Sequence, residues 1–339
     1  MKNKATTMPG TTKYVPVYQN MGVNTLAFLA DGITNSPELK GHINSEGYLE
    51  YTKDGILYKI DVSKKFMPVR MHQFLMYLIS KYTQNVRQGA SDARSDKFAV
   101  MEVSFQELAE VFGVNVKQAK IIAVQSAISL RHLSIYTRWQ TDSDEIYEET
   151  GILYEYWLRT NRVTRKGFIG ITFSERFRFF MKYMSVMMFP THLWKIIPKN
   201  NPYTYRFGYW LAINLKMNFG KRNWNRVSVN KLLDIAESLP KRYELGKAGQ
   251  VHKRIIAPVI RDLDALVQYG ILTEWYFEHQ VQRIPIEEYN RLKYDTFIDC
   301  RVVCYFSGNP EKMYLDSAKR NAGSAKTGSY KSKTGNTMS

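Results

Sequence analysis

The sequence carries the same order of helix and strand patterns twice, and this duplication limits the folds open to it. One copy runs over residues 66–173 and the other over residues 173–306. In each, an amphipathic helical pattern is followed by a short strand, two helices joined by a turn, and a β-ribbon. A chain of 339 residues has room for two domains of about 100–200 residues each. We therefore expect two domains of one architecture.

In the first copy, Pro68 marks a helix start and Phe98–Val103 alternates like a short strand. Ser104 and Glu107 have the spacing of a capping box, in which each side chain satisfies a backbone donor of the other residue. That helix should end at Gly113, and a second should cover Lys117–Arg131. Three strands are then expected, at Leu133–Trp139, Ile152–Leu158 and Phe168–Phe173.

The second copy contains a proline within its last helical pattern. Because the apolar periodicity runs through Pro258, we expect one kinked but continuous helix over His252–Tyr269. The other expected elements are helices at Tyr203–Met217 and Val229–Ser238 and strands at Asn225–Val227, Ile271–Phe277 and Thr296–Phe306. In both copies this is the element order of a winged helix. The sequence thus predicts an α+β fold of two tandem winged-helix domains.

We place these domains at residues 61–173 and 174–306. An N-terminal arm with short strands would cover residues 1–60, and a disordered basic tail residues 307–339, where Gly, Ser, Thr, Lys and Asn dominate. The chain has 48 Lys and Arg against 31 Asp and Glu, a net charge of +17 and a pI near 9.6. Such an excess favours a polyanionic partner, either nucleic acid or an anionic membrane surface.

No apolar stretch is long enough to cross a membrane, and the N-terminus lacks the apolar core of a secretory signal. The aromatic-rich segment Phe173–Trp194 is interrupted by cations, so we expect it to pack in the core or between the domains rather than on a membrane. Two cysteines exclude a disulfide scaffold and indicate a reducing cytoplasm. Cys300 and Cys304 are expected to be buried on one face of a strand.

Motifs of several enzyme classes are missing from the sequence. It contains no phosphate-binding Gly-x4-Gly-Lys-Ser/Thr loop, no Gly-x-Ser-x-Gly, no His-Glu-x-x-His and no His-x-His pair among its six histidines. We therefore expect a protein that is not an enzyme and needs no cofactor or metal. With 23 tyrosines, a nucleophilic tyrosine is not excluded by composition, and a DNA nicking or recombining enzyme stays an alternative.

Basic residues concentrate around the two central helices of the second copy. Lys221–Arg261 holds ten basic and three acidic residues. In a helix-turn-helix, the N-terminal part of the second helix enters the major groove and the surrounding cations neutralise phosphates. Arg254 can pair with the O6 and N7 atoms of guanine. The candidate DNA-binding residues of this copy are Lys247, His252, Lys253, Arg254 and Arg261.

The first copy offers a less basic second helix. Ile121, Val124 and Ile128 share much of its polar face, so this helix either reads bases or packs in a domain or dimer interface. Asp142–Glu149 would form an acidic tip that DNA avoids. The candidate DNA-binding residues are Lys117, Gln118, Lys120 and Gln125 on the helix, with Arg159, Arg162, Arg165 and Lys166 in a phosphate-contacting loop.

Three segments carry a resemblance to a known family: Val103–Ile135, Asn201–Asn218 and Arg254–Trp275. Together with the tandem pattern over residues 65–306, they resemble the plasmid replication initiators with two winged-helix domains, which bind repeated origin sequences called iterons. The resemblance implies binding of double-stranded origin DNA without catalysis, dimers that repress the protein's own gene, and recruitment of a host initiator and replicative helicase. It also implies that the helix His252–Arg261 is the principal iteron reader. A winged-helix transcriptional regulator is the alternative.

Overall fold

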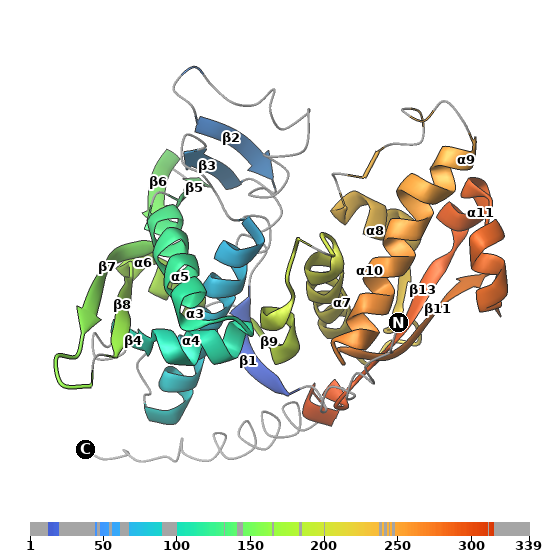
Figure 1. The fold of residues 1–339 in the computed structure, drawn as a ribbon. Coiled ribbons are helices and arrows are strands. Elements are labelled where there is room, and N and C mark those ends of the chain that lie inside the picture. The colour runs from blue at the N-terminus through green and yellow to red at the C-terminus, as the bar shows by residue number, and fades with distance from the viewer. Residues whose placement is uncertain are drawn as a thin grey trace, which may run out of the picture.

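The computed structural model describes most of the two expected domains and short parts of the N-terminal segment. The described residues are 13–19, 45, 48–53, 56–61, 68–89, 100–131, 133–140, 145–164, 166–182, 185–199, 201–236, 239–240, 243, 245, 248–310 and 312–314. They form helices and antiparallel strands in two lobes, an α+β arrangement (Figure 1). We call the lobe that contains the first copy of the sequence pattern unit 1 and the lobe that contains the second copy unit 2.

Unit 1 is built around three helices and a three-stranded sheet. The strand that precedes the second helix pairs with the last strand, which pairs in turn with the strand before it, giving the order β4-β8-β7. The elements are α3 (Pro68–Gly89), β4 (Val100–Ser104), α4 (Phe105–Phe112), α5 (Val116–Arg131), β7 (Leu153–Thr160) and β8 (Gly167–Phe173).

Unit 2 repeats this topology. Its strand order β10-β13-β11-β12 again places the last strand between the first strand and the middle one. The elements are α7 (Thr204–Asn218), β10 (Arg226–Ser228), α8 (Val229–Ile235), α9 (Ala248–Val251), η4 (His252–Ile256), α10 (Ala257–Gln268), β11 (Leu272–His279), β12 (Gln282–Arg283), η5 (Ile286–Arg291), α11 (Tyr294–Asp299) and β13 (Arg301–Phe306). The two units therefore share a helix, a short strand, two further helices and the placement of the last strand, although β5 and β6 intervene in unit 1 and β12, η5 and α11 in unit 2.

A second sheet in unit 1 differs from expectation. The strand after α5 pairs with an earlier strand and with the segment expected to be an acidic tip, in the order β2-β3-β5-β6. Glu145, Glu148 and Glu149 lie in β6, while Asp142 and Asp144 are outside the described residues. Ile146, Tyr147 and Thr150 favour this strand. The strands are β2 (Tyr48–Lys53), β3 (Ile56–Asp61), β5 (Leu133–Gln140) and β6 (Glu145–Gly151).

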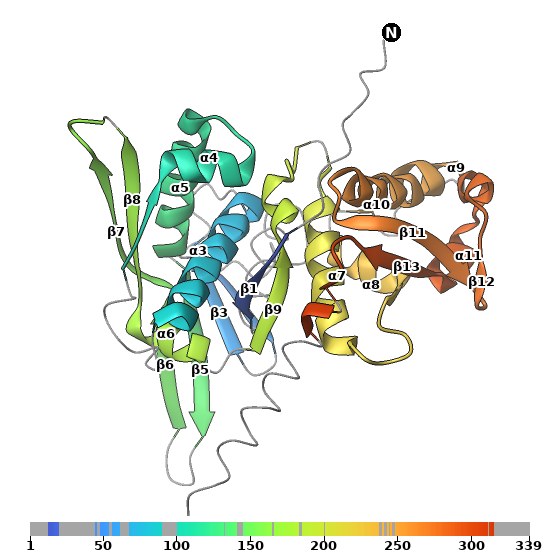
Figure 2. The ribbon, with the colours of Figure 1, turned by 90° about the horizontal axis from the view of Figure 1, so that it is seen from below.

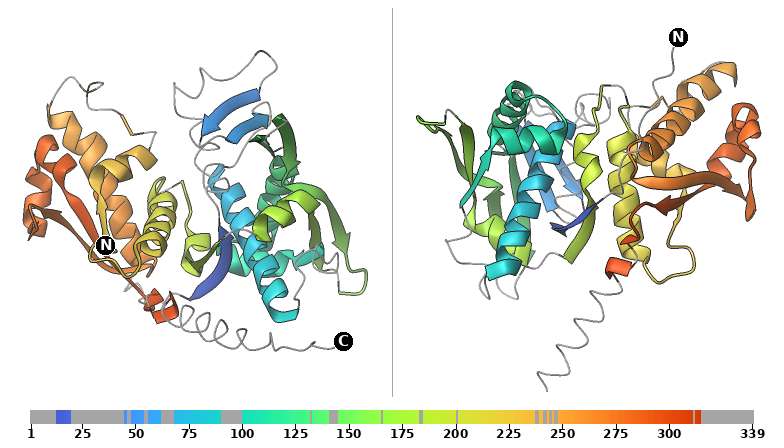
Figure 3. Two further views of the ribbon diagram at one scale, coloured as in Figure 1. Left: turned by 180° about the vertical axis from the view of Figure 1, so that it is seen from behind. Right: turned by 60° about the horizontal axis from the view of Figure 1, so that its bottom comes forward.

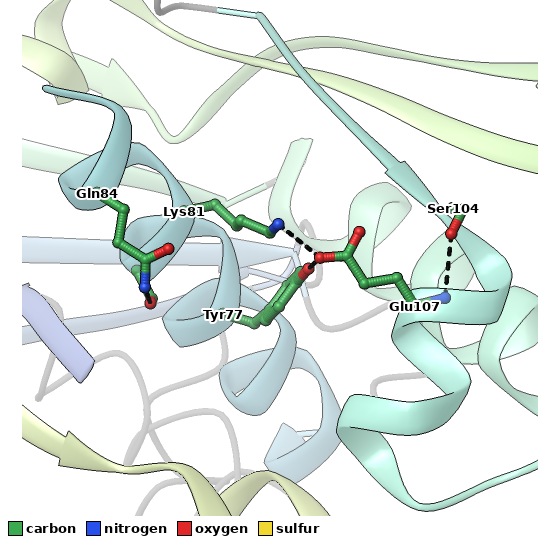
Figure 4. Close-up of polar contacts among 6 residues, drawn as sticks. Tyr77, Lys81, Gln84, Ser104 and Glu107 are labelled. Atoms are coloured by element: carbon green, nitrogen blue, oxygen red, sulfur yellow. Dashed lines mark hydrogen bonds and ion pairs between the residues drawn. The ribbon is translucent and has the colours of Figure 1, made fainter. Parts of the chain in front are cut away.

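The start of α4 confirms half of the predicted capping box. The Glu107 N–H donates to the Ser104 hydroxyl at 3.0 Å, and Gly113 ends the helix with φ of 62°. The Glu107 carboxylate instead accepts the Tyr77 hydroxyl at 2.5 Å and pairs with Lys81 at 2.5 Å, both on α3 (Figure 4). The side chain expected to close the cap therefore links α4 to α3. Burial and this hydrogen bond raise the pKa of Tyr77 well above its usual value.

The proline-containing helix of unit 2 is continuous from α9 through η4 to α10, as the sequence predicts. The turn before Pro258 is a π-turn, in which the Ala257 N–H donates to the His252 carbonyl. Since the proline ring would clash with a carbonyl one normal turn earlier and offers no N–H, a wider turn relieves both problems. The π-turn thus allows the helix to continue through Pro258.

The two units share one hydrophobic core along α3 and α7. His72 on α3 lies with its Nδ1 atom 2.7 Å from the Tyr205 hydroxyl on α7, and the Gln73 amide donates to the Leu193 carbonyl at 2.8 Å. Full burial lowers the pKa of His72 to about 3, so the ring is neutral in the folded protein. Between the lobes lie β1 (Tyr14–Gln19), β9 (Ser185–Pro190) and η2 (Thr191–Lys195), as Figures 2 and 3 show for the strands. Helix α6 (Glu175–Lys182) instead packs against β6 within unit 1.

Three further expectations concern the core and the chain ends. Phe177, Phe189 and Leu193 are fully buried, so the aromatic-rich segment packs inside the protein. In the described part of the chain, no helix is long and apolar enough to span a bilayer. Of the expected tail, residues 307–310 and 312–314 are described, and the Tyr314 hydroxyl accepts the Met188 N–H at 3.1 Å. Residues 315–339 are outside the described ones.

Candidate nucleic-acid interface

Along the long helix of unit 2, α9–η4–α10, the buried side chains are mostly apolar and the exposed ones are polar or charged. Its buried side includes the apolar residues Val251, Ile255, Ile256, Val259 and Leu263, and one charged residue, Asp262. Its exposed side chains are Gln250, Lys253, Arg254, Arg261, Asp264 and Gln268. Burial of the apolar side against the sheet leaves the cations facing solvent, which is the arrangement a groove-binding helix needs.

Lys253 and Arg254 lie within the π-turn itself. Pro258 cannot donate to the carbonyls of this turn, so the backbone here is wider and less fully bonded than in a regular helix. Single π-turns inside α-helices occur frequently at functional sites. The structure thus brings the two expected contact residues onto one exposed turn.

His252 occupies a different side of the same turn. It is half-buried, and its Nε2 atom lies 3.3 Å from the Tyr289 carbonyl oxygen in η5. Its neighbours Lys253 and Arg254 face solvent, whereas this ring faces the η5 segment. The structure does not bring His252 together with the exposed cations.

Arg261 is held by the residue next to it. Its Nη2 atom lies 2.7 Å from Oδ2 of Asp262, and the Arg261 side chain is 50% exposed while that of Asp262 is completely buried. The other Asp262 oxygen accepts the Tyr203 N–H at 3.0 Å and the Thr204 hydroxyl at 2.6 Å. The carboxylate therefore orients a surface guanidinium and joins α10 to the start of α7.

The corresponding helix of unit 1, α5, presents a mixed face. Its four expected contact residues, Lys117, Gln118, Lys120 and Gln125, are all exposed. Ile121 is 44% exposed among them, whereas Val124 and Ile128 are partly buried. The helix is therefore not enclosed, and both alternatives, base reading and packing in an interface, stay open.

The β7–β8 hairpin supplies the expected basic loop of unit 1. Arg162 and Lys166 are exposed, while Arg165 lies outside the described residues. The Asn161 side-chain oxygen accepts the N–H groups of Val163 and Thr164, which shapes the turn. These contacts hold the hairpin tip and leave two cations available to solvent.

Arg159 is already paired. Its guanidinium donates to both carboxylate oxygens of Glu102, at 2.6 and 2.5 Å, and lies 4.8 Å from the centre of the Phe168 ring. The sequence could not indicate this pairing because the two partners lie 57 residues apart. Arg159 is thus tied to the sheet of unit 1.

The tip of the unit 2 hairpin was not singled out by the sequence. Gln280 and Val281 both have positive φ, 48° and 67°, and Val281 is 81% exposed. Arg283 follows, 4.4 Å from the centre of the Tyr276 ring and 2.6 Å from Glu274. A turn of this kind normally carries Asn or Gly. Gln280 and Val281 are neither, so the sequence does not predict this turn. Lys247, the remaining expected contact, is outside the described residues.

The described residues contain no group of three or more potential metal ligands. Both cysteines are buried, as expected, although Cys300 ends α11 and only Cys304 lies in β13. Burial raises the pKa of Cys300 to about 11 and that of Cys304 further. Neither thiol is therefore a reactive thiolate at neutral pH.

Comparison with known proteins finds similarity among solved structures. No protein-family model matches the sequence, and no curated protein matches it. Among solved structures, the chain is similar to the Pi initiator protein, crystallised in complex with iteron DNA, with a TM-score of 0.48 and 10% sequence identity. The match covers 88% of this chain and 99% of the other. At this identity, residue roles do not transfer between the two proteins.

Proposed function

We propose that the protein is a sequence-specific DNA-binding protein that contacts duplex DNA through two winged-helix domains, one in each unit. The observation that carries this proposal is the repeated topology. In each unit two helices follow the first strand of the sheet, and the last strand lies between this first strand and the middle one. In unit 2 the second of these helices exposes Lys253, Arg254 and Arg261.

The proposed mode of binding follows from this geometry. The helix α9–η4–α10 enters the major groove through its π-turn, where Arg254 contacts base edges and Lys253 contacts a phosphate. The unit 1 helix α5 and the tip of the β7–β8 hairpin contact a neighbouring stretch, through Lys117, Arg162 and Lys166. A chain with a net charge of +17 displaces counterions from DNA, so its affinity should fall steeply with salt.

We further propose, from the family resemblance of the sequence, that the DNA is a set of repeated origin sequences and that the protein initiates replication of a plasmid or mobile element. On this proposal it binds without catalysis, dimerises, represses its own gene, and recruits a host initiator and replicative helicase in the cytoplasm. The tandem winged helices support this role, because two modules can read successive groove faces of one repeat.

DNase footprinting on the DNA that flanks the protein's own gene tests the proposal. Protection of several evenly spaced direct repeats is the expected result. Protection of a single inverted repeat would make the protein a transcriptional regulator instead. A protected stretch shorter than about one helical turn would contradict binding through two domains.

A further inference from the structure

The N-terminal strand lies between the two units. Strand β1 pairs antiparallel with β9, from Tyr14 opposite Pro190 to Gln19 opposite Ser185. Strand β9 belongs to the segment that connects unit 1 to unit 2, and α7 follows it through η2. Figures 2 and 3 show the pair between α3 on one side and α7 on the other.

Residues 13–15 contact both units and the connecting segment. Val15 packs against the shared core, to which α3 contributes. The Tyr14 hydroxyl donates to the Ser307 carbonyl oxygen at 2.7 Å, directly after the last strand of unit 2. The Lys13 carbonyl oxygen accepts two hydrogen bonds from Thr191, from its N–H at 2.9 Å and its hydroxyl at 3.0 Å. One short strand thus bonds to segments more than 100 residues apart.

Two prolines, Pro16 on β1 and Pro190 on β9 opposite Tyr14, indicate which backbone groups of β1 bind β9. Pro16 lies opposite Met188, and the Met188 N–H donates to the Tyr314 hydroxyl rather than across the ladder. Residues 16 and 188 are therefore a pair without cross-strand hydrogen bonds, and a proline at such a position removes no hydrogen bond of the ladder. By alternation, Val15 and Val17 carry the hydrogen bonds to β9.

We propose that residues 13–19 are a clasp that fixes the orientation of unit 1 relative to unit 2 and thereby sets the spacing of their two DNA contacts. This inference rests on the proposed function. Side-chain packing of α3 on α7 joins the units. The clasp adds a backbone hydrogen bond between residues 13 and 191 and a bond from the Tyr14 hydroxyl to the Ser307 carbonyl oxygen. Residues 13–19 then position the DNA-binding helices without touching DNA.

Spacing is the property that such a clasp controls. Inserting one base pair between the two contacts moves them apart by about 3.4 Å and rotates them by about 35° around the duplex. A rigid pair of units loses one contact after the insertion, whereas a loosened pair follows the DNA. A role in stability alone would weaken binding equally at every spacing.

Two proline variants separate the clasp from general disruption. Val17→Pro removes an N–H that faces β9, whereas Tyr18→Pro falls in the same row as Pro16, where no ladder bond is lost. Spin labels on Glu175→Cys and Asp295→Cys, both exposed, report the distance between the units without DNA. The native thiols are buried and should not be labelled. We expect Val17→Pro to broaden or shift the distance distribution and Tyr18→Pro to leave it as in the parent chain.

The DNA measurement uses a protected repeat and the same repeat with one inserted base pair. We expect the insertion to weaken binding by the parent chain at least about tenfold, equivalent to roughly 1.4 kcal/mol, and to weaken binding by Val17→Pro much less.

Unchanged distances between the spin labels in Val17→Pro would overturn the clasp. Changed distances with no spacing effect would refute its role in DNA contact, and a failure of the parent chain to bind DNA would refute the proposed function instead. If Val17→Pro does not fold, Tyr14→Phe with Thr191→Val removes only side-chain bonds and should still broaden the distances.

Discussion

The buried carboxylate of Asp262 should be among the most sensitive positions of unit 2. Its Oδ1 atom accepts the Tyr203 N–H at 3.0 Å and the Thr204 hydroxyl at 2.6 Å, and both Asp262 and Thr204 are fully buried. Asp262→Ala leaves these two donors without an acceptor where water does not reach them. Each costs about 1–3 kcal/mol, so we expect a loss of roughly 3–5 kcal/mol in the free energy of unfolding.

The ion pair with Arg261 adds little to this loss, because that side chain is half exposed and a pair at the surface contributes less than about 1 kcal/mol. Denaturant unfolding of Asp262→Ala and of Arg261→Ala, as the matched control, separates the two effects. Asp262→Asn should fall between them, since its amide oxygen keeps one acceptor. If Asp262→Ala were no less stable than Arg261→Ala, the reasoning from buried donors would be wrong.

Three further predictions concern DNA binding, backbone strain and pH. Arg254→Ala should cost about 1–3 kcal/mol at the preferred site and relax specificity at one base, whereas Lys253→Ala should weaken all sequences alike and lower the salt slope by about 1. Titrations of specific and random duplexes at several salt concentrations measure both effects. If each variant loses specific and nonspecific binding in equal proportion, Arg254 does not read a base. Val281→Gly should raise the free energy of unfolding by up to about 1 kcal/mol, because a β-branched residue is strained at φ of 67°. Denaturant unfolding measures this change, and a lower midpoint for the variant would show that the turn is not strained. His72 has a pKa of about 3 in the folded protein, against an ordinary value of 6.5. Between these two pH values only the unfolded chain binds the extra proton. The free energy of unfolding should therefore fall as the pH drops below 6.5, by about 2 kcal/mol at pH 5. His72→Gln should flatten this pH dependence, and an unchanged slope would place the titrating group elsewhere.

Local rules predicted several features of the fold from the sequence. Ser104 and Ser228 cap their helices through their hydroxyl groups, and Gly113 and Gly270 have positive φ where helices were expected to end. These features depend on residues within a few positions of each other, so the pattern of side chains is sufficient to identify them. The continuous helix through Pro258 belongs to the same class.

The features that the sequence did not predict depend on distant partners. Glu107 binds Tyr77, which lies 30 residues away, instead of closing its own cap. Arg159 pairs with Glu102, and Asp262 bonds to the start of α7, 58 residues earlier at Thr204. The hydrogen-bonding capacity of these side chains is visible in the sequence, whereas the choice of partner is set by packing of the elements.

Affinity cleavage tests most directly the claim that both units contact duplex DNA. A DNA-cleaving iron chelate would be attached at Arg162→Cys on the unit 1 hairpin in one protein, and at Gln282→Cys on the unit 2 hairpin in another; both positions are exposed. The account predicts two separate cleavage patches in each repeat, about one helical turn apart. Cleavage from only one of the two positions, or the same patch from both, would contradict it.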